Sequence, residues 1–266
     1  MIRDITIGQY YPTDSIIHRL DPRVKLMATL IYLVSLFVFR NAAGLVAVTV
    51  VLFFLIRLSK VPFRYMIKGL RAIVMILLLT AIFHLFLTPG EILVEFWKFQ
   101  ITKEGLRNAG FMTVRLIYLI LGSSLLTLTT TPNQLTDGME KALRPLNKIH
   151  VPVHEISMMM SIALRFIPIL IEETDKIMKA QLARGADFES GNLIKRAKAM
   201  IPLLIPLFVS AIRRANDLAL AMEARCYHGG EGRTKMRPLK YRKVDFAAYF
   251  VIAVYFAGMI LLRRMA

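Results

Sequence analysis

The sequence predicts an all-α polytopic membrane protein with about five transmembrane helices and a cytoplasmic domain of about three further helices, two of them long. Three observations predict this fold class. Hydrophobic residues make up 56% of the 266 residues, above the roughly 45–50% of soluble domains, and they are gathered in runs. The 35 lysines and arginines outnumber the 18 acidic residues and lie mostly between those runs. Two further apolar runs continue directly into charged helical sequence, which is typical of long helices.

Five runs are suitable for crossing a bilayer. A spanning helix needs about 20 mostly apolar residues, and a shorter run relies on flanking arginine and lysine side chains that reach the interface. The predicted spans are residues 24–39, 42–58, 70–87, 111–128 and 246–262. Only Arg40 and Asn41 separate the first two, which predicts a tight helical hairpin.

The basic residues predict the orientation of the spans. Lysine and arginine in short loops stay in the cytoplasm, and the loop after the second span and the region after the fourth are both rich in them. The N-terminus and both regions are therefore expected inside. Arg263 and Arg264 would then lie outside, against the rule, and the internal loops outvote them. The net charge of +17 records this topology, and no nucleic-acid partner is expected.

Residues 89–108 are expected outside the membrane, with an interfacial helix around Trp97, because tryptophan near a membrane edge usually lies at the headgroup level. Arg115 and His84 fall inside predicted spans. Ionisable groups there are functional candidates by default. The alternative is that both lie near a span end and reach the interface.

The domain organisation follows from these assignments. We predict that residues 1–130 form a membrane part with four spans, 131–243 form cytoplasmic helices, and 244–266 form the last transmembrane helix. The opening MIRDITIGQYYPTDS has no apolar core or cleavage site, so no removable signal peptide is expected. The single cysteine, Cys226, excludes an intramolecular disulfide and fits a reducing compartment.

Three helical segments are predicted in the cytoplasmic region. The first has Thr131 as its N-cap and Pro132 at its first helical position, and it ends near Arg144. The second runs from Pro152 to about Arg184, roughly 50 Å of helix, and the third covers residues 192–226. Residues 156–171 are long enough to span, so a seven-span arrangement is the alternative to two long helices on the inner face of the membrane.

The two long helices end alike, in QLARGADF and MEARCYHG. Each ending has an arginine preceded by alanine and followed by a small residue, and Gly185 suits the left-handed position after a helix. A cation in the last helical turn interacts favourably with the macrodipole, so simple capping is one interpretation. The other is docking, because an arginine fork pairs bidentately with carboxylates.

Four stretches carry a resemblance to a known family: LDPRVKL at residues 20–26, LRFIPIL at 164–170, QLARGAD around Arg184 and AMEARCY around Arg225. The chain resembles the transmembrane T component of energy-coupling factor (ECF) type ABC transporters. The resemblance implies a scaffold in the cell membrane that docks on two ATPase subunits and holds a membrane S component, which binds a vitamin or micronutrient.

The resemblance also implies a site. The family's ATPase-docking elements correspond here to Ala183-Arg184-Gly185 and Ala224-Arg225-Cys226. The family more often has glycine or serine where Cys226 lies. ATP-driven closure of the ATPases would move the two helix ends, and the helices would transmit that motion to the S component. Three consecutive methionines are expected to contact the S component as an adaptable apolar patch, with ordinary membrane packing as the alternative; they are Met158, Met159 and Met160.

Other classes of protein have weaker support. No G-x-x-x-x-G-K-[ST] motif is present, so no ATP site of that type, no enzyme activity and no cofactor are expected. The stretch HEISM lacks the second histidine of H-E-x-x-H, and Pro152 lies between His150 and His154, so no metal site is expected. A self-sufficient secondary transporter, which needs polar groups at mid-membrane, and a membrane enzyme are the alternatives.

Overall fold

The structure, a computed structural model, describes residues 10–39, 41–71, 73–96, 99–188, 190, 192–230, 236 and 238–264. The chain divides into two compact units. The bundle unit comprises Gly8–Met139 and Leu239–Ala266, and the long-helix unit comprises mainly Glu140–Pro238. The predicted all-α polytopic fold class is confirmed, since the regular secondary structure of the described residues is helical apart from one hairpin.

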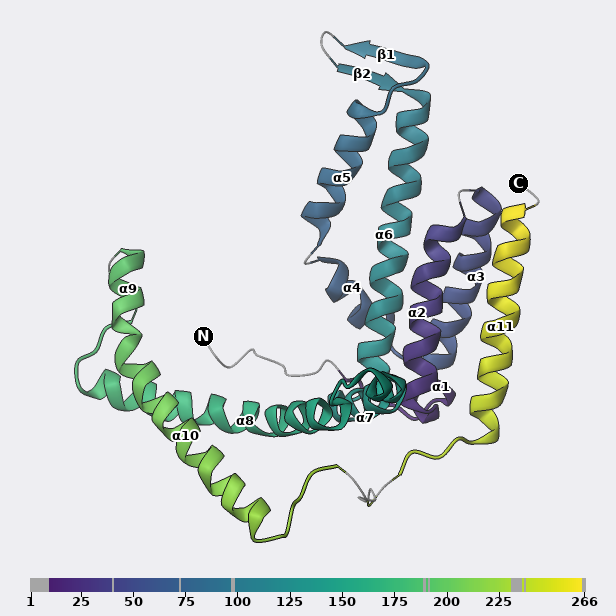
Figure 1. The fold of residues 1–266 in the computed structure, drawn as a ribbon. Coiled ribbons are helices and arrows are strands. Elements are labelled where there is room, and N and C mark those ends of the chain that lie inside the picture. The colour runs from purple at the N-terminus through teal and green to yellow at the C-terminus, as the bar shows by residue number, and fades with distance from the viewer. Residues whose placement is uncertain are drawn as a thin grey trace. The chain divides into compact units, whose positions relative to one another are not determined.

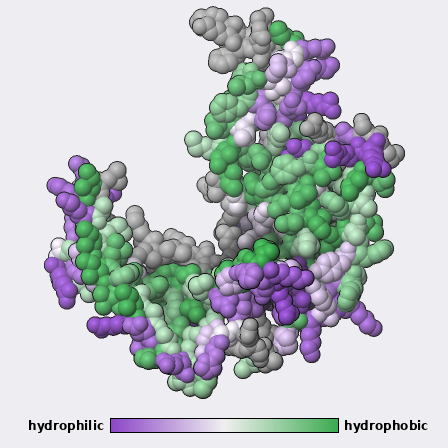
Figure 2. Space-filling model, viewed as in Figure 1, coloured by the Kyte–Doolittle hydropathy of each residue, from purple (hydrophilic) through white to green (hydrophobic). Residues whose placement is uncertain are grey.

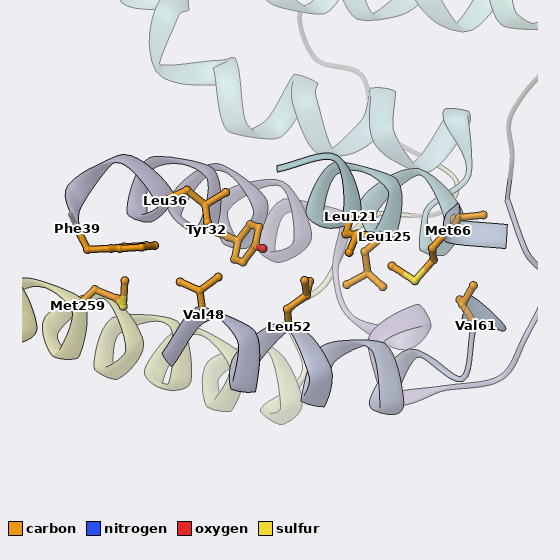
Figure 3. Close-up of a cluster of buried hydrophobic side chains, with 11 residues drawn as sticks. Tyr32, Leu36, Phe39, Val48, Leu52, Val61, Met66, Leu121, Leu125 and Met259 are labelled. Atoms are coloured by element: carbon orange, nitrogen blue, oxygen red, sulfur yellow. The ribbon is translucent and has the colours of Figure 1, made fainter. Parts of the chain in front are cut away.

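The bundle unit contains most of the helices. They are α1 (Ile16–Arg19), α2 (Pro22–Val38), α3 (Ala42–Ser59), α4 (Phe63–Arg71), α5 (Val74–Leu87), α6 (Lys103–Thr129), most of α7 (Pro132–Leu143) and α11 (Lys243–Arg264). Helices α2, α3, α6 and α11 lie side by side (Figure 1). Their facing side chains form the core, in which Tyr32 and Leu36 of α2 meet Val48 of α3 and Met259 of α11 (Figure 3).

The membrane spans differ from the prediction in detail. Among the described residues, four helices are long and apolar enough to cross a membrane, namely α3, α6, α8 (Val153–Ala183) and α11. The predicted span 24–39 corresponds to α2, which has 17 residues. Helix α8, which the sequence placed on the inner face, meets the length and composition of a span. Its location on that face is therefore part of the proposal made below.

The predicted span 70–87 is wrong as a single helix. It is divided between α4, which ends at Arg71, and α5, which has 14 residues. The sequence of α4, FRYMIKGLR, has basic residues at regular intervals, whereas that of α5 has no acidic or basic residue except His84. The chain therefore changes at this break from an amphipathic helix to a wholly apolar one.

The predicted interfacial helix within 89–108 is also wrong. Strands β1 (Ile92–Phe96) and β2 (Phe99–Thr102) form an antiparallel hairpin there, and Trp97 lies outside the described residues. Pro89 and Gly90 do not continue α5, and the β-branched and aromatic residues that follow favour strands. Helix α6 already begins at Lys103, because the Thr102 hydroxyl accepts a hydrogen bond from the backbone N–H of Gly105 at 3.0 Å.

The long-helix unit contains the 3-10 helix η2 (Arg144–Ile149), α8, α9 (Leu193–Ala199) and α10 (Ile201–Glu223).

The predicted Thr131 cap of α7 is confirmed. The Thr131 hydroxyl accepts from the N–H of Gln134 at 3.3 Å, and the Gln134 side chain accepts from the N–H of Thr131 at 3.2 Å. The predicted helix 192–226 is divided at Met200, beside Pro202, which cannot donate a backbone hydrogen bond.

The LDPRVKL stretch forms a cluster of charged side chains in the bundle unit. The Asp21 carboxylate caps α2 by accepting from the N–H of Arg23 at 2.9 Å. Asp245, at the start of α11 and 1% exposed, accepts from the N–H of Asp21 at 2.8 Å and of Arg242 at 2.7 Å. The Arg23 guanidinium donates to the Leu239 carbonyl at 3.1 Å. The cluster thus joins the start of α2 to the start of α11.

Lys25 extends this cluster to α1 and α6. Its ammonium group donates to the carbonyl of His18 at 3.0 Å and to the carbonyl of Thr129 at 2.8 Å, and the residue is 5% exposed. Both carbonyls lie at helix ends, where no intrahelical partner is available. LDPRVKL carries part of the family resemblance, and in the structure its charged residues join α1, α2, α6 and the start of α11.

Replacement of Asp245 by alanine should reduce the free energy of unfolding by about 2–4 kcal/mol, since two backbone N–H groups lose their acceptor. Thermal unfolding of the purified chain in detergent measures the effect. Asp217→Ala, at an exposed site on α10, is the matched control and should change stability by less than about 0.5 kcal/mol. Equal losses in both variants would contradict the role given to Asp245.

Candidate functional site

Helices α8 and α10 cross in an antiparallel sense within the long-helix unit (Figure 1). The Gln181 side chain, near the end of α8, donates to the Pro202 carbonyl at the start of α10 at 3.1 Å. Further along both helices, Arg214 donates to Glu173 at 3.0 Å. These two contacts hold the helices antiparallel. The C-terminal end of α8 therefore lies far from the C-terminal end of α10.

Part of the interface between α8 and α10 is apolar, and α10 contributes several small residues to it. Ala211, Ala215 and Ala219 recur every four residues along α10 and face Ile162 and Phe166 of α8 across a groove of about 290 Å³. Small side chains at this spacing allow two helix backbones to approach closely. The sequence-based predictions did not include these alanines, although their four-residue period is visible in the sequence.

The first Ala-Arg-small ending is a helix cap. Arg184 is the last residue of the helical turn, and Gly185 has a left-handed φ of 86°, as predicted. The N–H of Ala186 bonds to the carbonyl of Gln181 at 3.0 Å, and the N–H of Gly185 bonds to that of Leu182 at 3.0 Å. This pair of bonds is the Schellman motif.

The second ending has the same geometry. The N–H of Tyr227 bonds to the carbonyl of Met222 at 3.0 Å, and the N–H of Cys226 bonds to that of Glu223 at 2.8 Å. Cys226 has a φ of 54°, in the region where an L-residue meets steric strain. The small third residue of each ending therefore occupies the left-handed position, and each arginine is held immediately before it.

All six residues of the two endings are exposed. They are Ala183, Arg184, Gly185, Ala224, Arg225 and Cys226. Within the described part of the chain, neither Arg184 nor Arg225 has a hydrogen bond or ion pair from its guanidinium group. The caps satisfy the backbone carbonyls by themselves, so both arginine side chains have their donors available for a partner.

The two arginines lie far apart. Gln181, three residues before Arg184, contacts the start of α10, and Arg225 follows its end. Because α10 has 23 residues, its length is about 34 Å. A single small ligand cannot reach both arginines, whereas two docking grooves on separate protein subunits can.

Hydrophobic side chains gather on part of the surface of the long-helix unit, next to hydrophilic ones (Figure 2). Met159 is 61% exposed and Met160 is 37% exposed, while Met158 is half-buried. A second apolar set lies on one face of α10, within one of the two apolar runs that continue into charged helical sequence. Its exposed members follow the helical period and are Ile201, Leu204, Ile205, Phe208, Val209 and Ile212. Exposed apolar area of this extent indicates a membrane or protein contact.

Two further ionisable groups, Arg115 and His154, form hydrogen bonds within the protein. The Arg115 guanidinium donates to the Phe39 carbonyl at the end of α2, at 3.0 Å. His154 and Ser157 both contact the Glu140 carboxylate, at 3.2 and 3.1 Å. Among the described residues, no group of three or more histidine, cysteine, aspartate or glutamate side chains could hold a metal ion.

Comparison with known proteins gives consistent matches over most of the chain. Residues 13–236 match the family model CbiQ, described as a cobalt transport protein. The chain is 57% identical over 250 residues to the energy-coupling factor transporter transmembrane protein EcfT of Clostridium kluyveri, covering 93% of each chain. It is 47% identical over 264 residues to the protein of that name from Bacillus subtilis, covering 99% of this chain and 100% of the relative.

The cap geometry predicts opposite effects of two substitutions. Cys226→Gly should stabilise the end of α10 by roughly 1 kcal/mol, because glycine adopts the left-handed conformation without a Cβ clash. Gly185→Ala should destabilise the end of α8 by a similar amount. Hydrogen exchange at the Tyr227 and Ala186 amides, which close the two caps, measures both effects.

Ala224→Gly serves as the control for added backbone freedom, because Ala224 has a helical φ of −60°. This variant should speed exchange at Tyr227, whereas Cys226→Gly should slow it. If both glycine variants speed exchange, the left-handed strain assigned to Cys226 is absent.

Proposed function

This chain belongs to the CbiQ family and to its EcfT members, the transmembrane proteins of energy-coupling factor transporters, and from that membership we propose that it is the scaffold subunit of an ECF-type ABC importer. In this proposal the scaffold has no ATP site and couples ATP hydrolysis by two cytoplasmic ATPase subunits to a membrane S component that binds a vitamin or micronutrient. The observation that supports it most strongly is the pair of identical caps with exposed arginines at opposite ends of one helix crossing.

The arginines are the docking groups in this proposal. Arg184 binds one ATPase subunit and Arg225 binds the other. A guanidinium fork pairs with carboxylates or with helix-end carbonyls and stays charged at any physiological pH. The Schellman closure reduces the backbone freedom next to each arginine, and a partner therefore loses less conformational entropy when it binds.

The helix crossing carries the motion. ATP-driven closure of the two ATPases changes the distance between their docking grooves, and both arginines follow. Helices α8 and α10 transmit this displacement as rods that pivot about their contact, where Arg214 bonds to Glu173. Pro168 in α8 and Pro206 in α10 each remove one backbone hydrogen bond, which makes a bend at these positions less costly.

The apolar surface of the long-helix unit supports a contact with the S component. Methionine side chains adapt to several partners, and Met158, Met159 and Met160 are continuous in sequence. The exposed apolar face of α10 extends the same kind of surface. In this proposal the N-terminus and the long-helix unit are cytoplasmic, and α8 and α10 lie along the inner face, in contact with lipid and the S component.

Charge reversal at the helix ends tests the docking role. Arg184→Glu and Arg225→Glu should each weaken capture of the ATPase subunits about 30-fold or more, the loss expected for a central charged contact of 2 kcal/mol. Pull-down from membranes that contain all subunits measures it, together with substrate uptake. Lys176→Glu and Arg213→Glu make the same charge change at exposed sites further from the two ends and should have little effect.

Two results would contradict the docking role. One is assembly and uptake at the original level in both end variants. The other is an equal loss in the end variants and in the control variants, because that outcome would indicate a general effect of net charge.

The pivot is tested by exchanging its charges. Arg214→Glu places a carboxylate beside Glu173, and uptake should fall while the ATPases remain bound. The double variant Arg214→Glu with Glu173→Arg should recover uptake, with a coupling energy of about 0.5–1 kcal/mol for this partly exposed pair in a double-mutant cycle. Independent, additive effects of the two substitutions would show that the pair does not act as a unit.

A further inference from the structure

The bundle unit contains an apolar hollow of about 330 Å³, which the docking function does not use. Its wall is formed by α1, α2, α3, α6 and α11, through residues such as Val24, Leu55, Leu125 and Val251. A volume of this size is within the range of small-molecule pockets. The hollow is half-open, so its apolar wall is accessible from outside the bundle.

The polar side chains on the wall already have partners inside the protein. Lys25 donates to the carbonyls of His18 and Thr129. The hydroxyl of Thr29 donates to the Lys25 carbonyl at 2.9 Å, and that of Tyr32 donates to the Tyr118 carbonyl at 3.1 Å. A polar solute would gain few new hydrogen bonds here and would lose those it makes with water. An alkyl chain makes no hydrogen bonds with water, so it has none to lose on entry.

Exposed basic residues lie next to one end of the hollow. Leu58 lines the wall, and exposed Lys60 follows it at the end of α3. Val244 also lines the wall, and exposed Lys243 precedes it at the start of α11. The neighbouring carboxylate of Asp245 is buried and accepts two backbone hydrogen bonds. The exposed Asp14 carboxylate interacts with Lys60, but it is paired with the Arg19 guanidinium, and this pair adds no net charge. The accessible charge beside the hollow at Lys60 and Lys243 is therefore positive.

We infer that this hollow binds one acyl chain of an anionic phospholipid, whose phosphate lies near Lys60 and Lys243. The apolar wall selects the chain, and the two ammonium groups select a headgroup with net negative charge. The lipid fills the space between α2, α3 and α11 and makes the dispersion contacts that an empty hollow would lack. This binding site is separate from both arginine caps.

Photo-crosslinking to defined lipids tests the inference. The full chain, with the subunits that co-purify with it, is placed in phosphatidylcholine nanodiscs that contain a trace of photoreactive phosphatidylglycerol or photoreactive phosphatidylcholine, each with the reactive group on the acyl chain. Mass spectrometry then identifies the labelled peptides. The phosphatidylglycerol probe should label wall segments of α2, α3 or α11 about ten-fold more than the phosphatidylcholine probe does, which corresponds to 1.4 kcal/mol.

Two pairs of variants separate the chain from the headgroup. Ala248→Phe places a ring in the hollow and should abolish wall labelling, whereas Ala253→Phe, at an exposed position of α11 outside the wall, should leave it unchanged. Lys60→Glu with Lys243→Glu should remove the preference for phosphatidylglycerol. Arg263→Glu with Arg264→Glu makes the same charge change at the other end of α11 and should keep the preference.

The inference is overturned by labelling of the wall that Ala248→Phe does not reduce, or by equal labelling with the two lipids in the unsubstituted protein. It is also overturned if the wall is labelled only after the co-purifying subunits are removed, because a protein segment would then be the occupant. None of these results depends on whether Arg184 and Arg225 bind ATPase subunits.

Discussion

The antiparallel crossing of α8 and α10 is the constraint on which the candidate functional site depends. Gln181 contacts Pro202, Arg214 contacts Glu173, and a row of alanines on α10 lets the two backbones approach. Because the helices run in opposite directions, their C-terminal ends are separated by about the length of α10, roughly 34 Å. A change in the crossing would change that separation. The same crossing that holds the two arginines apart can therefore convert a movement of one helix end into a movement of the other.

The capping and docking interpretations of the two endings are compatible. The structure shows that both arginines precede a left-handed residue in a Schellman closure, which explains why the third residue of each ending is small. The closure satisfies the last helix carbonyls without using the arginine side chains. Each guanidinium group therefore remains available for a partner while the backbone beside it is held.

Local patterns in the sequence predicted much of this structure, and long-range contacts account for most of what they missed. The Thr131 cap and the left-handed Gly185 depend on neighbouring residues, so short motifs were sufficient to identify them. The contact between Asp21 and Asp245 joins positions 224 residues apart, and no local pattern encodes it. The strands β1 and β2 were missed because a single tryptophan was given more weight than the β-branched and aromatic residues around it. The left-handed Cys226 was unexpected because its conformation is imposed by the end of α10 and not by its own preference.

The claim that the two helix ends hold two ATPase subunits is tested most directly by site-specific photo-crosslinking in the assembled complex. A photoreactive amino acid is introduced in place of Ala183, Ala224 or, as a control, the exposed Ala253 of α11. The account predicts that the positions of Ala183 and Ala224 each crosslink to an ATPase subunit and that the position of Ala253 does not. Capture of ATPase at neither helix end, or equal capture at all three positions, would contradict it.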